Sequence, residues 1–225
     1  MLVSKSKLLQ KHNQIILDNY KKFGGVHMGP YASYTWRRDP KHLFFSMARY
    51  KFCARILAGK ENILEIGCGD AFGMPIMLQS VNKVHGIDIE PLIIELNKKL
   101  NEHPNRCRFE TLDITQKAVK QKYDGAVCLD VIEHIAKNKE RLFMSNIVSA
   151  LKKNAVLIMG TPNIEAHKWA SVNSREGHIN LKSAESLKEL LQSSFKNVFL
   201  FSMNDEIVHT GFYPMAHYFM GIGIK

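Results

Sequence analysis

The chain has 225 residues, of which 45% are hydrophobic and 23% charged, values that exclude a disordered or low-complexity chain and indicate a folded globular protein. It contains no apolar run near the about 20 residues that span a bilayer, no recognisable signal peptide and no Cys-x-x-Cys pair, so we expect a cytoplasmic protein without membrane insertion or a metal site. The net charge of +10 lies in residues 1–60, which hold twelve lysines and arginines against two acids; this either attracts a phosphorylated small molecule, nucleic acid or an anionic membrane, or is a solvated helix face.

The first part of the chain is predicted to be a helical extension. Residues 1–20 carry apolar side chains at roughly helical spacing. Residues 21–41 contain several glycines and prolines, which predict a loop or broken segment. Residues 42–58 are predicted to form a second helix that ends at a glycine. We therefore expect an N-terminal helical lid segment at 1–58 and a second domain at 59–225.

Strands and helices alternate from residue 61 onward. Strands are predicted at Asn62–Ile66, Lys83–Ile89, Cys107–Leu112, Gly125–Leu129, Ala155–Gly160 and Asn197–Met203, with a last one within 207–219. Helices are predicted at Pro75–Ser80, Pro91–Leu100, Lys139–Leu151 and Ser183–Ser193. Such alternation favours parallel pairing in a doubly wound α/β sheet, in which ligands bind at the carboxyl ends of the strands.

A glycine-rich segment follows the first predicted strand. Gly67 and Gly69 permit a tight turn and close approach of a ligand to the backbone, and the following helix start offers unpaired amide donors. A dinucleotide fingerprint would place the third glycine at Phe72, but it stands at Gly73. The spacing therefore disfavours nicotinamide binding.

Acidic residues stand at the ends of the next three predicted strands. Asp88 ends the second strand, Asp113 and Ile114 follow the third, and Asp130 follows the fourth. Asp88 could accept hydrogen bonds from both hydroxyls of a ribose, and Asp113 could meet an adenine amino group with Ile114 against the ring. Each acid alone is equally well a helix cap or a surface residue. Together, behind a glycine loop, they indicate a nucleoside site.

With these segments the sequence resembles the class I S-adenosylmethionine (SAM)-dependent methyltransferases, in the small-molecule group related to ubiquinone-biosynthesis methyltransferases. The resemblance covers about residues 45–205 and is strongest in Leu64–Gly73, Gly86–Ile89 and Tyr123–Ile135. It implies SAM as cofactor and a Rossmann-like sheet of seven strands with the last strand antiparallel.

The resemblance also implies roles for individual residues. Glu65, Gly67 and Gly69 would surround the amino-acid end of SAM. Asp88, with its neighbour Ile89, would hold the ribose. Asp113 and Ile114 would hold the adenine, and Asp130 would lie near the methionine, with the stretch up to His134 facing the active site. These are the cofactor-binding residues that we expect: Glu65, Gly67, Gly69, Asp88, Ile89, Asp113, Ile114 and Asp130.

Histidines are the candidates for the catalytic base. The sulfonium methyl is already activated, so transfer needs mainly alignment and a dry pocket, but an alcohol acceptor also needs a base. His178 lies in a polar loop after the fifth strand, and histidine is the side chain whose usual pKa suits this role. His134, soon after Asp130, is the second candidate. A purely structural role for either histidine stays open.

The acceptor is expected to contact the N-terminal segment. Tyr34, Trp36 and Arg37 lie in a stretch that mixes aromatic residues with arginines, and Arg49 follows in the next helix. Guanidinium groups bind carboxylates and phosphates bidentately, so Arg37, Arg38 or Arg49 could pair with the carboxylate of SAM or with a phosphate of the acceptor. His209, near the C-terminus, is a further candidate for contact with the acceptor. The alternative is a lid that only packs on the core.

The sequence thus predicts a methyltransferase that acts on an oxygen, or a nitrogen, of a small anionic acceptor such as a phosphorylated metabolite or a nucleotide-activated sugar. A nucleic-acid methyltransferase would explain the charge equally well. However, the Asn/Asp-Pro-Pro-aromatic motif after the fourth strand is missing and no RNA-binding module is recognisable, so nucleic acid is not expected. A SAM-binding protein without activity and a homodimer formed through the apolar tail Met215–Lys225 both stay open.

Overall fold

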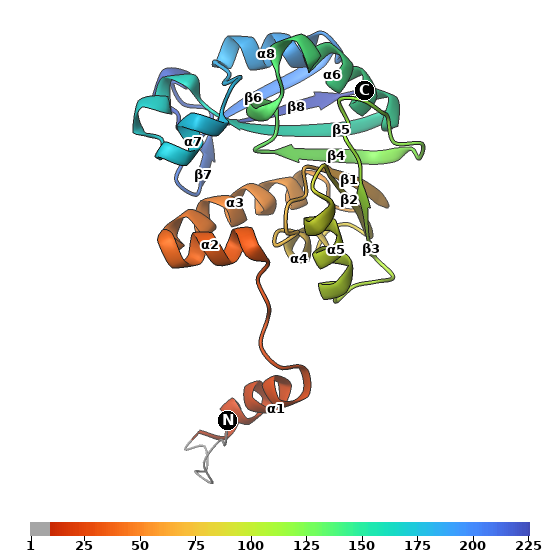
Figure 1. Cartoon of the computed structure of the whole chain (residues 1–225), viewed down its shortest axis with the longest axis vertical. Helices are drawn as coiled ribbons and strands as arrows, with labels where there is room; N and C mark the ends of the chain where they lie inside the picture. The colour runs from red at the N-terminus through yellow and green to blue at the C-terminus, as the bar shows by residue number, and fades with distance from the viewer. Residues whose placement is uncertain (1–9) are drawn as a thin grey trace.

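The computed structural model describes residues 10–225 and is built around one eight-stranded sheet with the order β3-β2-β1-β4-β5-β8-β6-β7 (Figure 1). Strands β3, β2, β1, β4 and β5 pair in parallel, whereas β8 runs antiparallel between β5 and β6. The strands are β1 Asn62–Ile66, β2 Lys83–Asp88, β3 Cys107–Thr111, β4 Tyr123–Leu129, β5 Leu151–Pro162, β6 Asn197–Asn204, β7 Ile207–His209 and β8 Tyr218–Ile224.

Helices cover both faces of this sheet. The helices are α1 Gln14–Phe23, α2 Pro30–Arg38, α3 Pro40–Ile56, α4 Met74–Met77, α5 Pro91–Leu100, α6 Glu140–Ala150, α7 Val172–Gly177 and α8 Ala184–Gln192. One buried cluster joins α6 and α8 to the face of β1 that carries Leu64 and Ile66. The other joins α3, α4 and α5 to the opposite face, which carries Ile63. The alternation of side chains along a strand thus supplies both layers of the core, and the predicted doubly wound α/β fold is confirmed.

The number of strands differs from the prediction of seven. Asp205, with φ 49°, lies in a turn that reverses the chain, and Ile207–His209 then pair antiparallel with the end of β6 as the short edge strand β7. The last strand begins later than expected, at Tyr218, because the buried residues of the tail, Tyr218–Gly223, fill the gap between β5 and β6. The predicted antiparallel last strand is confirmed as β8. The short strand β7 is the one by which the sheet exceeds the seven strands predicted.

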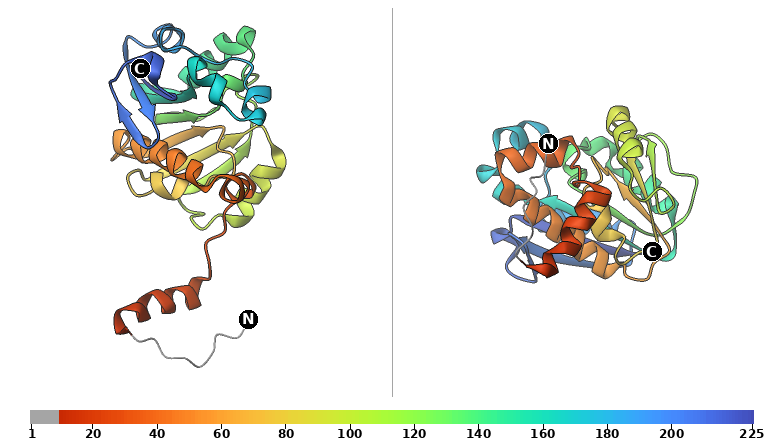
Figure 2. Two further views of the ribbon diagram at one scale, coloured as in Figure 1. Left: turned by 90° about the vertical axis from the view of Figure 1, so that its left-hand side faces the viewer. Right: turned by 90° about the horizontal axis from the view of Figure 1, so that it is seen from below.

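The N-terminal segment is more helical than the sequence suggested. Residues 21–41 were predicted to be a loop, but α2 forms within them because Pro30 occupies its first turn, where proline is pre-shaped for a helix and its missing N–H costs nothing. Only 24–29 form an open linker. The predicted helix at 1–20 falls partly on 1–9, which lie outside the described residues; the observed α1 ends three residues later, at Phe23. This helix stands away from the body of the molecule (Figures 1 and 2).

No helix within the described range 10–225 is long and apolar enough to cross a membrane. The predicted division of the chain at residue 58 stays a prediction.

Candidate functional site

The glycine loop between β1 and α4 is shaped by what surrounds it. Gly67 has φ +68° and Gly69 has φ +48°. Residues other than glycine rarely adopt these backbone conformations. A Cβ at Gly67 would lie 2.3 Å from Cγ2 of Val131. The backbone N–H groups of Gly67 and Cys68 donate to the carbonyl of Ile87 at 2.9 and 3.0 Å. The loop is therefore fixed between β2 and the segment that follows β4.

Gly73 has a packing role. A Cβ at this position would lie 2.3 Å from the ring of Tyr50, on α3. Tyr50 reaches across the loop, and its hydroxyl donates to Oε1 of the buried Glu65 at 2.7 Å. Gly73, which departs from the dinucleotide spacing, is therefore needed to make room for Tyr50 of α3.

Burial raises the pKa of Glu65 to about 7, against the hydrogen bond from Tyr50, which lowers it. Because the folded-state pKa is raised, this carboxyl contributes stability that is complete below the unfolded-state pKa near 4.5 and is lost as the pH rises to about 7. We therefore expect unfolding measured by urea titration to show a loss of stability between pH 4.5 and 7 that Glu65→Gln reduces. An unchanged pH profile in Glu65→Gln would contradict this.

A cavity of about 590 Å³ lies above the loop, at the carboxyl ends of β1, β2 and β4, a volume in the range of small-molecule sites. Of the predicted cofactor residues, only Glu65 lies outside its lining and beneath the loop. The predicted site residues that line the cavity are Gly67, Gly69, Asp88, Ile89, Asp113, Ile114, Asp130, Arg49 and His134. The structure thus brings together predicted site residues from five separate segments of the chain.

The acids at the strand ends differ in how much of their hydrogen-bonding capacity is used. Each oxygen of Asp88 accepts one backbone N–H, from Gly69 at 2.9 Å and from Glu90 at 3.0 Å, which leaves acceptor capacity on both. In Asp113, Oδ1 accepts from the backbone and hydroxyl of Thr115, and Oδ2 accepts from the amide of Gln116. Asp113 therefore has less capacity left for a ligand than Asp88.

Arg49 is held by an acid of the site. Its Nη1 lies 3.1 and 2.8 Å from the two carboxylate oxygens of Asp130, and its guanidinium lies 3.7 Å from the ring centroid of Tyr218. Arg49 is buried, whereas the Asp130 side chain is 44% exposed. Asp130 itself has φ +55°, a strained conformation of the kind that clusters at functional sites. Sequence reasoning assigned Arg49 to the acceptor or the cofactor and did not foresee this ion pair.

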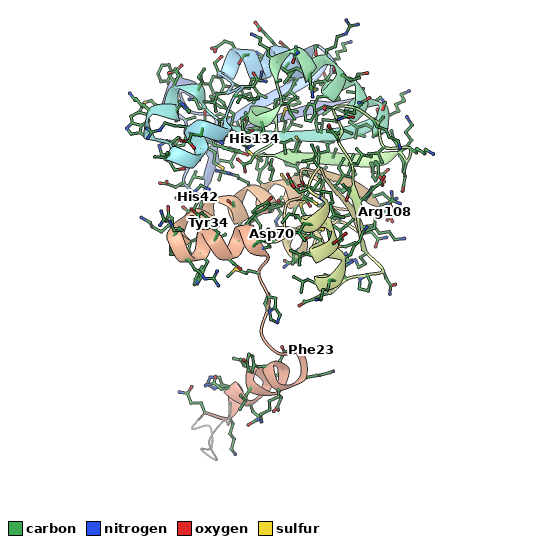
Figure 3. The ribbon with its side chains drawn as sticks, viewed as in Figure 1. Phe23, Tyr34, His42, Asp70, Arg108 and His134 are labelled. Atoms are coloured by element: carbon green, nitrogen blue, oxygen red, sulfur yellow. The ribbon has the colours of Figure 1, made fainter. Side chains whose placement is uncertain are left out.

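The loop after β5 brings His178 beside His134. The two imidazole rings lie 5.1 Å apart, and Nδ1 of His134 lies 2.9 Å from the carbonyl oxygen of Gly177. Both predicted base candidates therefore share one position beyond the carboxyl end of β4. Figure 3 shows His134 above α2 and α3. Burial lowers the pKa of His178, and the neighbouring His134 lowers it further.

Sequence reasoning did not single out Glu133, which completes this group. Glu133 is fully buried, Thr161 donates to its Oε2 at 3.0 Å, and Oε1 has no hydrogen-bond partner within the described chain. Burial raises the pKa of Glu133 above its usual range. We name Glu133, His134 and His178 the base cluster. Their ligand atoms all lie within 4.8 Å of one another, and two imidazoles with one carboxylate suit a divalent transition-metal ion.

Four of the predicted acceptor residues do not reach the cavity. Tyr34 and Arg37 are exposed on α2, and Trp36 lines a second cavity of about 470 Å³ between α2, α3, α4 and α5. His209 is engaged in β7, with Nε2 3.0 Å from Oδ1 of Asn204. Their contact with an acceptor stays a prediction.

The N-terminal segment is attached to the glycine loop through Asp70. Its Oδ2 accepts a hydrogen bond from the backbone N–H of Ala32 at 2.8 Å, in the first turn of α2 (Figure 3). Tyr31 lines the cavity above the glycine loop, and a Cβ on Gly69 would lie 3.2 Å from the Tyr31 ring. The start of α2 therefore closes one side of the cavity.

Asp70→Ala should remove this N-terminal cap, at a cost of about 1 kcal/mol. We expect faster amide hydrogen exchange in α2 together with an affinity for a cavity ligand that falls several-fold. Asp39→Ala, at the other end of α2, serves as control because the Asp39 side chain makes no cap hydrogen bond. Equal exchange rates in the two variants would show that Asp70 does not hold the helix.

The chain is similar to known methyltransferases in sequence and in fold. A family model described as "Methyltransferase domain" matches residues 36–194. Among curated proteins, the ubiquinone biosynthesis O-methyltransferase of Rickettsia prowazekii (strain Madrid E) is 32% identical over 107 residues, and that of Rickettsia akari (strain Hartford) is 30% identical over 106. Each match covers 46% of this chain and 41% of the relative, so less than half of either protein is compared.

Solved structures share the fold. The methyltransferase domain of bacterial CtHen1-C has a TM-score of 0.65 at 16% identity, over 80% of this chain and 98% of that one. The N-methyltransferase NodS from Bradyrhizobium japonicum WM9, in complex with S-adenosyl-L-homocysteine (SAH), has a TM-score of 0.60 at 18% identity, over 84% and 91%.

Proposed function

Because the chain belongs to the class I SAM-dependent methyltransferases, whose methyltransferase-domain model matches residues 36–194, we propose that it transfers the methyl group of SAM to an oxygen of a small anionic acceptor. One observation carries this proposal: the cavity over the glycine loop is lined both by the acids at the strand ends and by His134 of the base cluster. In this proposal the cofactor-binding site and a proton acceptor share one cavity.

In this proposal the cofactor occupies the cavity along the strand ends. Its ribose hydroxyls donate to the acceptor capacity left on Asp88, and its adenine lies against Ile89 and Ile114. The amino-acid end lies over the backbone of Gly67 and Gly69, near Asp130, all of which line this cavity. Burying the sulfonium in this chamber excludes water and aligns the methyl group for in-line attack.

The base cluster supplies the proton acceptor that a hydroxyl nucleophile needs. A carbonyl oxygen can only accept a hydrogen bond, so Nδ1 of His134, 2.9 Å from the carbonyl of Gly177, carries the proton. Nε2 of His134 is then free to take the proton of the acceptor as the O–CH₃ bond forms and the S–CH₃ bond breaks. His178 stands beside it as the second candidate base. A divalent ion on the same three side chains would lower the pKa of the acceptor hydroxyl.

Oxygen is favoured over nitrogen by the base cluster and by the relatives named as O-methyltransferases. The anionic character of the acceptor is supported by the charge of residues 1–60. NodS, a structural neighbour, is an N-methyltransferase, so an amine acceptor is the alternative that the experiment must separate.

Calorimetric titration with SAM and SAH tests the cofactor seat. We expect both to bind, and absence of binding by either would refute the proposal. Formation of SAH from SAM is then measured with phenols, phosphorylated metabolites, nucleotide-activated sugars and amines as acceptors. Turnover on hydroxyl acceptors that carry a phosphate supports the proposal, whereas turnover confined to amines or to uncharged acceptors contradicts it.

A further inference from the structure

Helix α1 presents an apolar face that nothing in the described chain covers. It contains no buried residue and stands apart from the sheet and its helices (Figure 2). Ile15, Ile16, Tyr20 and Phe23 are 76%, 67%, 60% and 67% exposed. An isolated helix of ten residues is marginal in water, so a surface that buries this face would stabilise it.

The side chains of α1 are segregated around its axis. At about 100° per residue, Ile15, Ile16, Tyr20 and Phe23 occupy a continuous arc of about 140°. The remaining arc holds the charged side chains of the helix, Asp18, Lys21 and Lys22. Nζ of Lys22 lies 4.8 Å from the centroid of the Phe23 ring, at the boundary between the two faces. Apolar side chains edged by lysines are typical of helices that lie in the interface of a membrane.

The surroundings of α1 share both properties. Residues 10–60 hold ten lysines and arginines against two acids. Of the 24 large hydrophobic residues that are exposed in the described chain, 11 lie within residues 15–47. Basic charge attracts anionic lipid headgroups, at about 1 kcal/mol for each lysine or arginine near the surface, while the apolar side chains enter the acyl boundary.

We propose that α1 docks the protein on an anionic lipid surface, with Ile15, Ile16, Tyr20 and Phe23 in the interface and Lys21 and Lys22 at the headgroups. Nucleic acid would use the lysines but leave the two isoleucines in water. Pairing of α1 with the same helix of a second copy would bring like charges together. The linker 24–29 contains the pair Gly24-Gly25, which lets the catalytic body pivot while its six residues keep it within about 20 Å of the surface.

Flotation of the whole 225-residue chain with vesicles tests this proposal. We compare phosphatidylcholine vesicles with vesicles of equimolar phosphatidylcholine and phosphatidylglycerol. The wild-type protein should float with the anionic vesicles, bind the neutral ones much more weakly, and gain helical circular dichroism when it binds. No flotation with anionic vesicles would overturn the proposal.

Three variants separate the two contributions. Ile16→Asn/Tyr20→Asn removes apolar area without changing charge and should lower vesicle affinity at least about tenfold. Lys21→Gln/Lys22→Gln should lower it about tenfold or more on anionic vesicles and little on neutral ones. Lys188→Gln/Lys196→Gln removes two exposed charges elsewhere on the chain and should bind like the wild type.

Two outcomes count against the lipid surface. If Ile16→Asn/Tyr20→Asn binds vesicles as well as the wild type, α1 is not the docking element. If sedimentation shows a dimer of the wild-type protein and a monomer of this variant, the apolar face of α1 binds a second copy of the chain and not a lipid surface. SAH affinity should be unchanged in all three variants, so failure of membrane docking leaves the proposed methyl transfer untouched.

Discussion

Asp88→Ala should weaken SAH binding about 100-fold. Asp88 lines the cavity, and each of its two oxygens accepts one backbone N–H. Hydrogen bonds to a charged group contribute about 1.5–3 kcal/mol each. Loss of two such bonds from the ribose corresponds to about 3 kcal/mol, or two orders of magnitude in the dissociation constant. Calorimetric titration with SAH measures it.

Asp113→Ala is the matched comparison. Both oxygens of Asp113 are already used within its own turn, so we expect a clearly smaller loss of SAH affinity than in Asp88→Ala. Because Gly69 donates to Asp88, thermal unfolding of each variant shows whether the loop itself has collapsed. A folded Asp88→Ala protein that binds SAH like the wild type would contradict the proposed seat of the ribose.

The second large effect is expected at the base cluster. His134→Ala and His178→Ala should each leave SAH affinity within about threefold of the wild type, and the variant that removes the base should lower kcat at least about 100-fold, the usual contribution of a general base. The lowered pKa of His178 keeps it neutral and able to accept a proton near pH 7. Turnover with the acceptor found in the panel is the measurement, and wild-type turnover in both variants would eliminate the cluster.

A chelator separates the two ways in which this cluster can act. If the histidines work alone, EDTA leaves turnover unchanged. If the three side chains hold a divalent ion, EDTA abolishes turnover, added Mn²⁺ or Zn²⁺ restores it, and Glu133→Gln weakens binding of the ion measured by calorimetry. His12→Ala is the control for both arms, since His12 is exposed ahead of α1 and lies outside the lining of the cofactor cavity.

The sequence was informative where the signal is local. The glycine loop and the acids at the strand ends follow from residues that stand next to one another in the chain, and seven of the eight predicted cofactor residues line the same cavity. Alternating strands and helices gave the doubly wound sheet because each element carries its own hydrophobic pattern. Their roles in binding stay predictions that the variants above test.

What sequence reasoning missed depends on pairs that are distant in the chain. Arg49 and Asp130 are separated by 81 positions, and Ala32 and Asp70 by 38; no local pattern marks either partner. Glu133 is adjacent to His134, and only the fold shows that it is buried and faces Thr161. Helix α2 was not predicted because a proline after a glycine, here Gly29-Pro30, is compatible with a turn as well as with a helix start. The hydrogen bond from the backbone of Ala32 to Asp70, which favours the helix, is visible only in the fold.

The position of α3 has a consequence for building chimeras. Arg49 and Tyr50 come from a helix ahead of the sheet, yet one anchors Asp130 and the other packs on Gly73. A hybrid joined at residue 58 would take Arg49 and Tyr50 from the other parent protein, and these contacts with Asp130 and Gly73 would no longer be native. A joint at Asp39–Pro40, between α2 and α3, keeps Arg49 and Tyr50 native. The new front end then replaces Tyr31, which lines the same cavity, and is expected to alter the choice of acceptor.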